Sequence, residues 1–227
     1  MTPGNIAGMA ALKGLQIVAL TDHNSCRNCP AFLAACEKNG LVGIAGMELT
    51  TAEEIHVVCL FEELAAAMRF SDTVDTHRFK IKNKPDIFGE QLILDENDEV
   101  IGEEEHLLIN ATDLSLEEAT ALVRQHGGIA LPAHIDKQSN GIIGILGAFP
   151  DTPEYAFAEL ADLSKKEELL AEQPALADVA FLCDSDAHYL WDIHEAEYAL
   201  SLSPCSTEPT AIRQALFALL QGKEKNA

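Results

Sequence analysis

The sequence predicts an α/β protein built around a parallel sheet or barrel. Apolar segments of strand length alternate with segments of helical period, and short polar connections separate them. Several of the strand-like segments are apolar on both faces, which is typical of strands that are covered on both sides. The 227 residues, of which 48% are hydrophobic, suffice for a domain with a full core. Because neither an internal repeat nor a low-complexity tract divides the chain, we expect a single domain over 1–227.

The first quarter of the chain sets the alternating pattern. Thr2 has the character of a helix N-cap, and Pro3 suits the first helical position. The run 15–23 is apolar throughout and predicts a strand buried inside a parallel sheet, not a strand at its edge. In chain order we expect a helix within 2–14, a strand over 15–23, a helix over 28–39 that ends at Gly40, and strands over 41–50 and 55–61.

The segment 62–112 interrupts this alternation. A helix is expected from Phe61, and 90–104 reads as two extended arms around a polar turn, which predicts an antiparallel hairpin. We interpret 62–112 as an insertion at one end of the sheet or barrel. Alternation resumes with a helix from Ser115, a strand over 128–134, a weak strand over 155–160, a helix over 164–173, a strand within 178–188 and a helix over 207–222. Ser115 and Glu118 have the spacing of a capping box.

Charge and composition exclude several classes of function. Acidic residues outnumber basic ones 37 to 15, and the net charge of −22 repels a polyanion, so we expect duplex DNA not to be a partner. No apolar run approaches the roughly 20 residues that cross a bilayer, so we expect no membrane association. The six cysteines are too sparse for a disulfide scaffold, and a cytoplasmic location is expected.

The spacing of Cys26 and Cys29 admits two interpretations. A zinc or redox site is one of them, but the chain offers no second pair of this kind. Cys29 and Cys36 fall on a similar face of the expected helix. We therefore favour buried core thiols for all three.

Potential metal ligands stand at the ends or the beginnings of five strand-like segments. A single histidine in such a place is more often a hydrogen-bonded structural residue, but five ligand-bearing strands in series favour a metal site. The carboxyl ends of parallel strands share one face of an α/β fold, so these side chains are expected to converge. Imidazole and carboxylate suit zinc, manganese and iron. The candidate ligands are His23, Glu48, His56, His134, Asp186 and His188.

Two aromatic residues follow the last ligand pair. His194 and Trp191 could line the rim of the site, although packing is the commoner explanation for such residues. His106 and His126 need only surface or helix-end roles.

Four segments resemble, in order, the motifs of the polymerase and histidinol phosphatase (PHP) superfamily. They are GLQIVALTDHNS, GIAGMELTTAEEIHVVCLF, GGIALPAHIDK and FLCDSDAH. The resemblance covers about 15–190 and implies a distorted TIM-like (β/α)7 barrel that binds two or three divalent ions (Mn, Zn or Fe) and hydrolyses phosphate esters. It also implies that all six candidate residues are ligands, that Glu48 bridges metals, and that Glu48, His134 and Asp186 carry catalysis. Lys137 matches a position where relatives often place a basic residue that contacts the substrate phosphate. A solvated lysine in a loop is an equally good interpretation.

The chain departs from the family pattern at its start. Members begin with a strand bearing His-x-His, whereas Met1 of this sequence aligns with the interior of a member. We therefore expect the first barrel strand to be missing and fewer metal ions than usual. An open edge would remain, and the hairpin at 90–104 could support a homodimer by strand addition.

Two functions follow from this comparison. The first is metal-dependent hydrolysis of a small phosphorylated metabolite, a nucleotide or the end of a short oligonucleotide. The compact spacing of Glu48 and His56 resembles that of the nucleotide phosphoesterase and 5′-3′ exonuclease branch. The second is a catalytically degenerate structural or interaction module of PHP fold, because the N-terminal ligands are absent.

Overall fold

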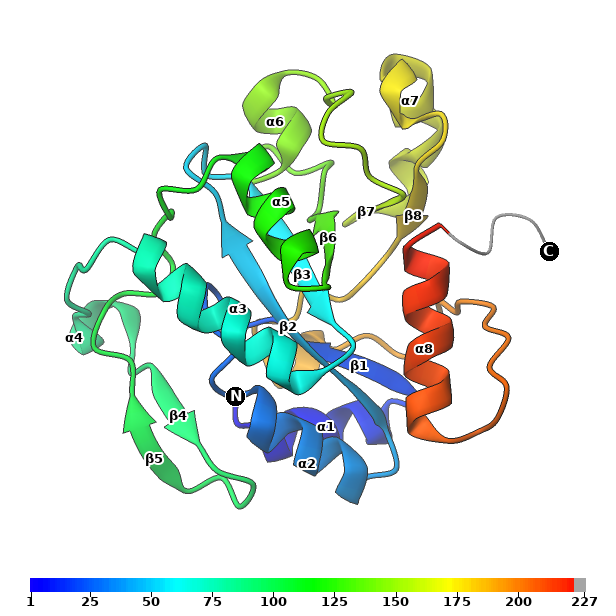
Figure 1. The fold of residues 1–227 in the computed structure, drawn as a ribbon. Coiled ribbons are helices and arrows are strands. Elements are labelled where there is room, and N and C mark those ends of the chain that lie inside the picture. Colours follow the sequence, from blue (N-terminus) through cyan, green and yellow to red (C-terminus); the bar gives the residue numbers. More distant parts are fainter. Residues whose placement is uncertain (223–227) are drawn as a thin grey trace.

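A four-stranded sheet forms the centre of the computed structural model, which describes residues 1–222 (Figure 1). In spatial order its strands are β1 (Ile17–Leu20), β2 (Val42–Thr50), β3 (His56–Phe61) and β6 (Ile129–Pro132). β1 and β2 are parallel, whereas β3 is antiparallel to both of its neighbours. A parallel pair, β7 (Phe157–Glu159) and β8 (Ala180–Leu182), adjoins this sheet: the amide of Ile135, just after β6, donates to the carbonyl oxygen of Glu159 at 2.9 Å.

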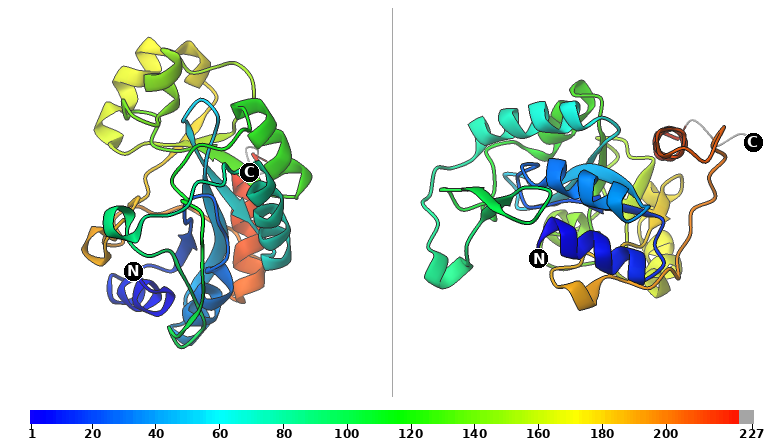
Figure 2. Two further views of the ribbon diagram at one scale, coloured as in Figure 1. Left: turned by 90° about the vertical axis from the view of Figure 1, so that its left-hand side faces the viewer. Right: turned by 90° about the horizontal axis from the view of Figure 1, so that it is seen from below.

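Helices cover both faces of the central sheet. The longer ones are α1 (Pro3–Leu12), α2 (Cys29–Lys38), α3 (Leu64–His77), α5 (Leu116–Gln125) and α8 (Pro209–Leu220). The shorter ones are α4 (Pro85–Phe88), α6 (Ile142–Leu146) and α7 (Lys166–Glu172), with 3₁₀ turns at Leu163–Lys165 (η1), Pro174–Leu176 (η2) and Leu190–Asp192 (η3). α1 lies alongside α2 (Figures 1 and 2). The first core cluster contains residues of α1, α2, α3 and α5, and the second contains those of α8.

The alternation of side chains along β2 decides which face carries the polar groups. Every residue of β2 is buried, as expected for a strand covered on both sides. Met47 belongs to the core cluster of α2 and α3, whereas Ile44 belongs to that of α8. Since successive side chains point to opposite faces, Glu48 lies on the same face as Ile44. Leu60 of β3 also belongs to the core cluster of α8. His56 lies an even number of positions before Leu60 in the same strand, so its side chain points to the same face.

The expectation of a uniformly parallel sheet is wrong at β3. Only residues 51–55 separate β2 from β3. A crossover between parallel strands needs about a dozen residues or more, so a connection of this length produces an antiparallel pair.

The expectation of an interior strand at 15–23 is also wrong. β1 pairs only with β2 and forms an edge of the central sheet as far as residues 1–222 are described. Apolar side chains report that the faces of a strand are covered, and they do not report how many strands flank it. Within the same residues the strands form no closed barrel, so the (β/α)7 barrel is not confirmed.

Several local predictions are confirmed. The 90–104 segment forms the antiparallel hairpin of β4 (Leu92–Leu94) and β5 (Val100–Glu103). Its turn is held by Asp95, whose Oδ1 accepts from the amides of Asn97 (2.8 Å) and Glu99 (3.0 Å). Thr2 caps α1 by accepting from the Asn5 amide at 3.3 Å. That 62–112 is an insertion and that the hairpin supports a dimer stay predictions.

The predicted capping box at the start of α5 is present. The Glu118 amide donates to Ser115 Oγ at 3.3 Å, and the Ser115 amide donates to Glu118 Oε2 at 2.9 Å. Replacing Ser115 with alanine is expected to lower the free energy of unfolding by about 1 kcal/mol, because a helix-end amide loses its acceptor. Urea denaturation measures the loss. Ser115→Thr keeps the hydroxyl and should recover most of it; an equal loss in both variants would contradict the capping role.

The interpretation of the cysteines as core thiols is confirmed. The side chains of Cys26, Cys29, Cys36 and Cys59 are fully buried. Cys26 Sγ and Cys29 Sγ both donate to the carbonyl oxygen of Gly46, at 3.1 and 3.4 Å.

Among residues 1–222, none of the helices combines the length and the apolar character that a membrane crossing requires.

Candidate metal centre

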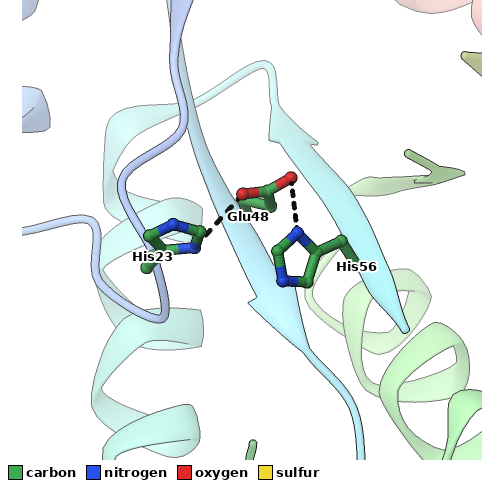
Figure 3. A group of neighbouring side chains, drawn as sticks. All are labelled: His23, Glu48 and His56. Atoms are coloured by element: carbon green, nitrogen blue, oxygen red, sulfur yellow. Dashed lines mark ion pairs between the residues drawn. The ribbon is translucent and has the colours of Figure 1, made fainter. Parts of the chain in front are cut away.

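Three imidazole rings lie around one buried carboxylate. Glu48 Oε2 lies 3.1 Å from His23 Nδ1, and Glu48 Oε1 lies 3.1 Å from His56 Nδ1 and 3.3 Å from His134 Nε2. Figure 3 shows His23 reaching Glu48 from the loop after β1, and His56 reaching it from β3. The side chains of Glu48 and His134 are only 7% and 4% exposed, whereas that of His23 is 25% exposed, so the carboxylate is shielded from water and the cluster opens to solvent at His23.

Backbone pairing beyond β1 places His23. The chain continues alongside β2 after β1 ends, because the Glu48 amide donates to the Asp22 carbonyl oxygen at 3.1 Å. The Asn24 amide in turn donates to the Glu48 carbonyl oxygen at 3.0 Å. Asn24 adopts a left-handed backbone (φ 48°), which asparagine tolerates well, and its Oδ1 accepts from the Thr50 amide at 2.9 Å. His23 is thereby held directly beside Glu48.

The other two rings come from the neighbouring strands. His56 is the first residue of β3 and lies opposite Thr50 of β2. His134 follows β6 in a left-handed backbone (φ 31°), and the Ala133 amide donates to the His56 carbonyl oxygen at 3.1 Å. A positive φ is uncommon for residues other than glycine, and such residues cluster at functional sites.

The donor atoms fit a divalent cation. His23 Nδ1 and His56 Nδ1 are buried and make no hydrogen bond, although each lies 3.1 Å from a Glu48 oxygen. The donor atoms of His23, Glu48 and His56 all lie within 4.8 Å of one another. Two ligands that each bind one cation at about 2.1 Å are themselves about 3.0 to 3.4 Å apart. The spacing and the unused nitrogens therefore suit zinc, manganese or iron.

The ionisation states also suit a cation. Burial acts to raise the pKa of Glu48, but its interactions with His134, His56 and His23 outweigh burial and hold the pKa well below its ordinary range. Burial lowers the pKa of His23, and the opposing effect of Glu48 only partly offsets this. The carboxylate is therefore ionised and the imidazole is neutral near pH 7, and these are the forms that bind metals.

Asp186 and His188 lie beside this cluster and not in direct contact with Glu48. The His188 ring centroid is 6.1 Å from that of His23, and His188 Nδ1 lies 2.9 Å from the Asp186 carbonyl oxygen. Lys137 Nζ forms an ion pair with Asp186 Oδ2 at 2.6 Å. The structure thus groups His23, Glu48, His56 and His134 at the centre and places the other three predicted residues at its rim.

The sequence interpretation missed Glu159. This residue ends β7, is 4% exposed, and its Oε1 has no hydrogen-bond partner. Burial raises its pKa to about 9, and the charges of Asp184, Asp186 and Glu48 add to this effect. The signal that could have found it is the same that indicated Glu48, namely an apolar strand that ends in a carboxylate.

The packing interpretation of Trp191 is wrong. Its side chain is 73% exposed and stacks on Tyr189, with the ring centroids 4.9 Å apart.

Several solved structures have a similar fold. The lesion-specific endonuclease Q of Pyrococcus furiosus aligns with a TM-score of 0.61 and 17% identity, covering 99% of this chain and 52% of that one. Endonuclease Q in complex with a 27-mer duplex substrate that carries an abasic lesion aligns with a TM-score of 0.58 and 17% identity, covering 99% and 53%. A candidate metal-dependent phosphoesterase of Bifidobacterium adolescentis aligns with a TM-score of 0.53 and 16% identity, covering 95% and 90%. The chain therefore spans about half the length of the endonuclease Q chains.

The expectation that duplex DNA is excluded as a partner is wrong. A protein with this fold has been solved on a duplex substrate, with the lesion at the active site. The net charge is a sum over the whole surface, whereas contact with a phosphate depends on the few charges near it. A net charge of −22 therefore does not exclude binding of DNA at one site.

Family membership is shown by the sequence itself. No protein of curated function matches the chain. The PHP domain family matches residues 1–138, which is more than half of the chain and includes His23, Glu48, His56 and His134. The chain belongs to the PHP domain family.

Proposed function

We propose that this protein is a metal-dependent phosphoesterase that hydrolyses a small phosphorylated metabolite, a nucleotide or the end of a short oligonucleotide. The observation that carries the proposal is the buried, ionised carboxylate of Glu48 with three imidazole rings within 3.3 Å of its oxygens. Membership in the PHP domain family supports the same chemistry.

Each group of the centre has a task in such a reaction. His23, Glu48, His56 and His134 would hold the cation, with Asp186 and His188 as further ligands at the rim. A divalent cation in this place supplies positive charge to a phosphoryl oxygen and lowers the pKa of a water molecule. Burial of Glu48 keeps bulk water from competing for the donor atoms.

Lys137 suits the binding of the substrate phosphate. Its side chain is 42% exposed, so its ammonium group is open to an incoming anion, and the 2.6 Å ion pair with Asp186 fixes it beside the centre. A phosphate dianion can share the ammonium group with Asp186 and thereby be oriented toward the centre.

Hydrolysis assays on the full chain test this proposal. The protein is stripped of metal, reloaded with manganese, zinc or iron, and offered bis(4-nitrophenyl) phosphate, a nucleoside 3′,5′-bisphosphate, short RNA and an abasic duplex. We expect metal-dependent turnover of at least one phosphate ester, reduced about 10- to 100-fold in His134→Ala.

The control is His126→Asn, since His126 lies at the end of α5 and contacts Phe70 instead of the centre. Thermal unfolding shows whether both variants fold. The proposal would be overturned if the wild-type protein binds metal stoichiometrically but hydrolyses none of the substrates faster than His134→Ala does. That result would favour the non-catalytic module.

A further inference from the structure

An exposed aromatic pair stands beside the metal centre. The rings of Tyr189 and Trp191 are stacked, with centroids 4.9 Å apart and planes 3° from parallel. They are 57% and 73% exposed, respectively. Trp191 is also the only tryptophan of the chain. Neither ring contributes to the core, so packing does not explain the pair.

The backbone beneath the two rings is well anchored. The Tyr189 amide donates to Asp192 Oδ2 at 3.1 Å, and the Asp192 amide donates to the Tyr189 carbonyl oxygen at 3.0 Å. Ile193, next in the chain, is 5% exposed and fixes the turn to the body of the protein. The rings are therefore presented to solvent by an ordered turn, and little further ordering is needed to bind a ligand.

The pair follows the last of the predicted ligands in the chain. Tyr189 follows His188, whose ring centroid lies 6.1 Å from that of His23. On the same rim, Lys137 is held by Asp186 at 2.6 Å. A ligand that joins a phosphate to a flat ring therefore suits a surface that offers both features.

Stacking adds binding energy that does not depend on charge. A nucleobase is neutral and flat, so an exposed aromatic ring can bind it whatever the net charge of the protein. In a stacked pair each ring covers one face of the other, so an outer face stays free for a third ring. Aromatic side chains stack with any base, and each such contact strengthens binding on the order of 10- to 100-fold.

We propose that Tyr189 and Trp191 form a stacking platform for the base of a nucleotide, or of the terminal residue of an oligonucleotide, whose phosphate ester is held at the metal centre. The proposal deepens and rests on the phosphoesterase function. It makes the preferred substrate a nucleotide and disfavours a sugar phosphate that lacks a base.

Fluorescence of the single tryptophan measures binding to the platform, a readout separate from the rate of hydrolysis. Adenosine 5′-monophosphate and ribose 5-phosphate are titrated into the manganese-loaded full chain. We expect the nucleotide to quench Trp191 emission and to bind on the order of 10- to 100-fold more tightly than the sugar phosphate. Tyr189→Ala should weaken nucleotide binding by a similar factor, with ribose 5-phosphate unaffected.

Variants of Trp191 give an independent measure by equilibrium dialysis. Trp191→Ala should lose nucleotide affinity, and Trp191→Tyr should recover most of it because a ring is restored. Phe88→Ala serves as the control, since Phe88 is an aromatic residue of α4 that is 48% exposed and is not part of the stacked pair. In hydrolysis of a nucleotide, Trp191→Ala should raise KM and leave kcat nearly unchanged.

The outcomes separate this proposal from the phosphoesterase function. Equal affinity of the wild-type protein for the two ligands, or unchanged nucleotide affinity in Trp191→Ala, would overturn the platform even if phosphate esters are hydrolysed. Base-dependent binding that is lost in Trp191→Ala, in a protein that hydrolyses nothing, would support the platform and reject the enzyme.

Discussion

Replacing Glu48 with glutamine is expected to lower manganese affinity by at least about 100-fold. The carboxylate is the common neighbour of His23, His56 and His134, at 3.1, 3.1 and 3.3 Å. The amide keeps the shape but removes the negative charge and replaces one ligand oxygen with a nitrogen that cannot bind a cation. Equilibrium dialysis followed by elemental analysis measures the affinity and the number of bound ions.

The same variant should alter the pH dependence of stability in metal-free protein. The pKa of Glu48 is depressed below its ordinary value of 4.5 in the folded state. The stabilising contribution of the carboxylate is therefore fully present above about pH 4.5 and is lost as the pH falls below it. The wild-type protein should exceed Glu48→Gln in stability at neutral pH, and the difference should shrink in acid.

Glu37→Gln is the matched control, because Glu37 is an exposed residue of α2. It should leave both the manganese affinity and the acid profile unchanged. Wild-type affinity in Glu48→Gln would show that Glu48 is not a ligand.

Replacing Glu159 with glutamine is expected to stabilise the metal-free protein increasingly as the pH rises. The pKa of Glu159 is about 9 in the folded protein and 4.5 ordinarily, because burial and nearby carboxylates disfavour its charge. Between these values the folded protein retains a proton that the unfolded chain releases. The free energy of unfolding of the wild-type protein therefore falls with rising pH, by up to about 1.4 kcal/mol per pH unit.

Glutamine mimics the protonated carboxyl and does not titrate. Relative to the wild-type protein, Glu159→Gln should gain roughly 3 kcal/mol between about pH 5.5 and 8. Chemical denaturation at several pH values measures the gain. Glu167→Gln, on the exposed side of α7, should follow the wild-type profile; a Glu159→Gln curve parallel to the wild-type curve would contradict the raised pKa.

Manganese should reduce this effect. A cation held beside Glu48 and Asp186 offsets the negative charges that raise the pKa of Glu159, so the carboxyl should ionise at lower pH. The pH slope of wild-type stability should be shallower with manganese present than in its absence.

Strand ends predicted which side chains meet around Glu48, because backbone alternation and strand pairing bring such positions together. His56 and Glu48 lie on one face of adjacent strands, a placement that the alternation of buried residues alone supports. The contact between Lys137 and Asp186 could not be predicted in this way, since 49 positions separate them and the contact depends on how the loops after β6 and β8 fold. Glu159 fitted the strand-end pattern but lies in a strand of only three residues, for which periodicity gives little signal.

The fold was predictable in its elements and less so in its strand directions. Helix limits followed from local chemistry, as at Ser115, where the cap is formed by neighbouring residues. The direction of β3 was misjudged although the five-residue link 51–55 carried the signal. The exposure of Trp191 could not be predicted from the residues next to it in the sequence. A large apolar side chain in a loop is expected to be buried, unless it lines a ligand site.

The buried thiols around Gly46 can report when α2 separates from the central sheet. Cys26 and Cys29 share one carbonyl acceptor beneath β2, and Cys36 and Cys59 are equally inaccessible. A hydrogen-bonding interaction with Cys29 and burial raise the pKa of Cys26, and burial raises that of Cys36 to about 12, so both remain protonated and unreactive in the folded state. Cys205 is exposed and should be alkylated at once. Slower labelling of Cys29 and Cys36, both in α2, would then time the separation of α2 from the central sheet, without any added probe.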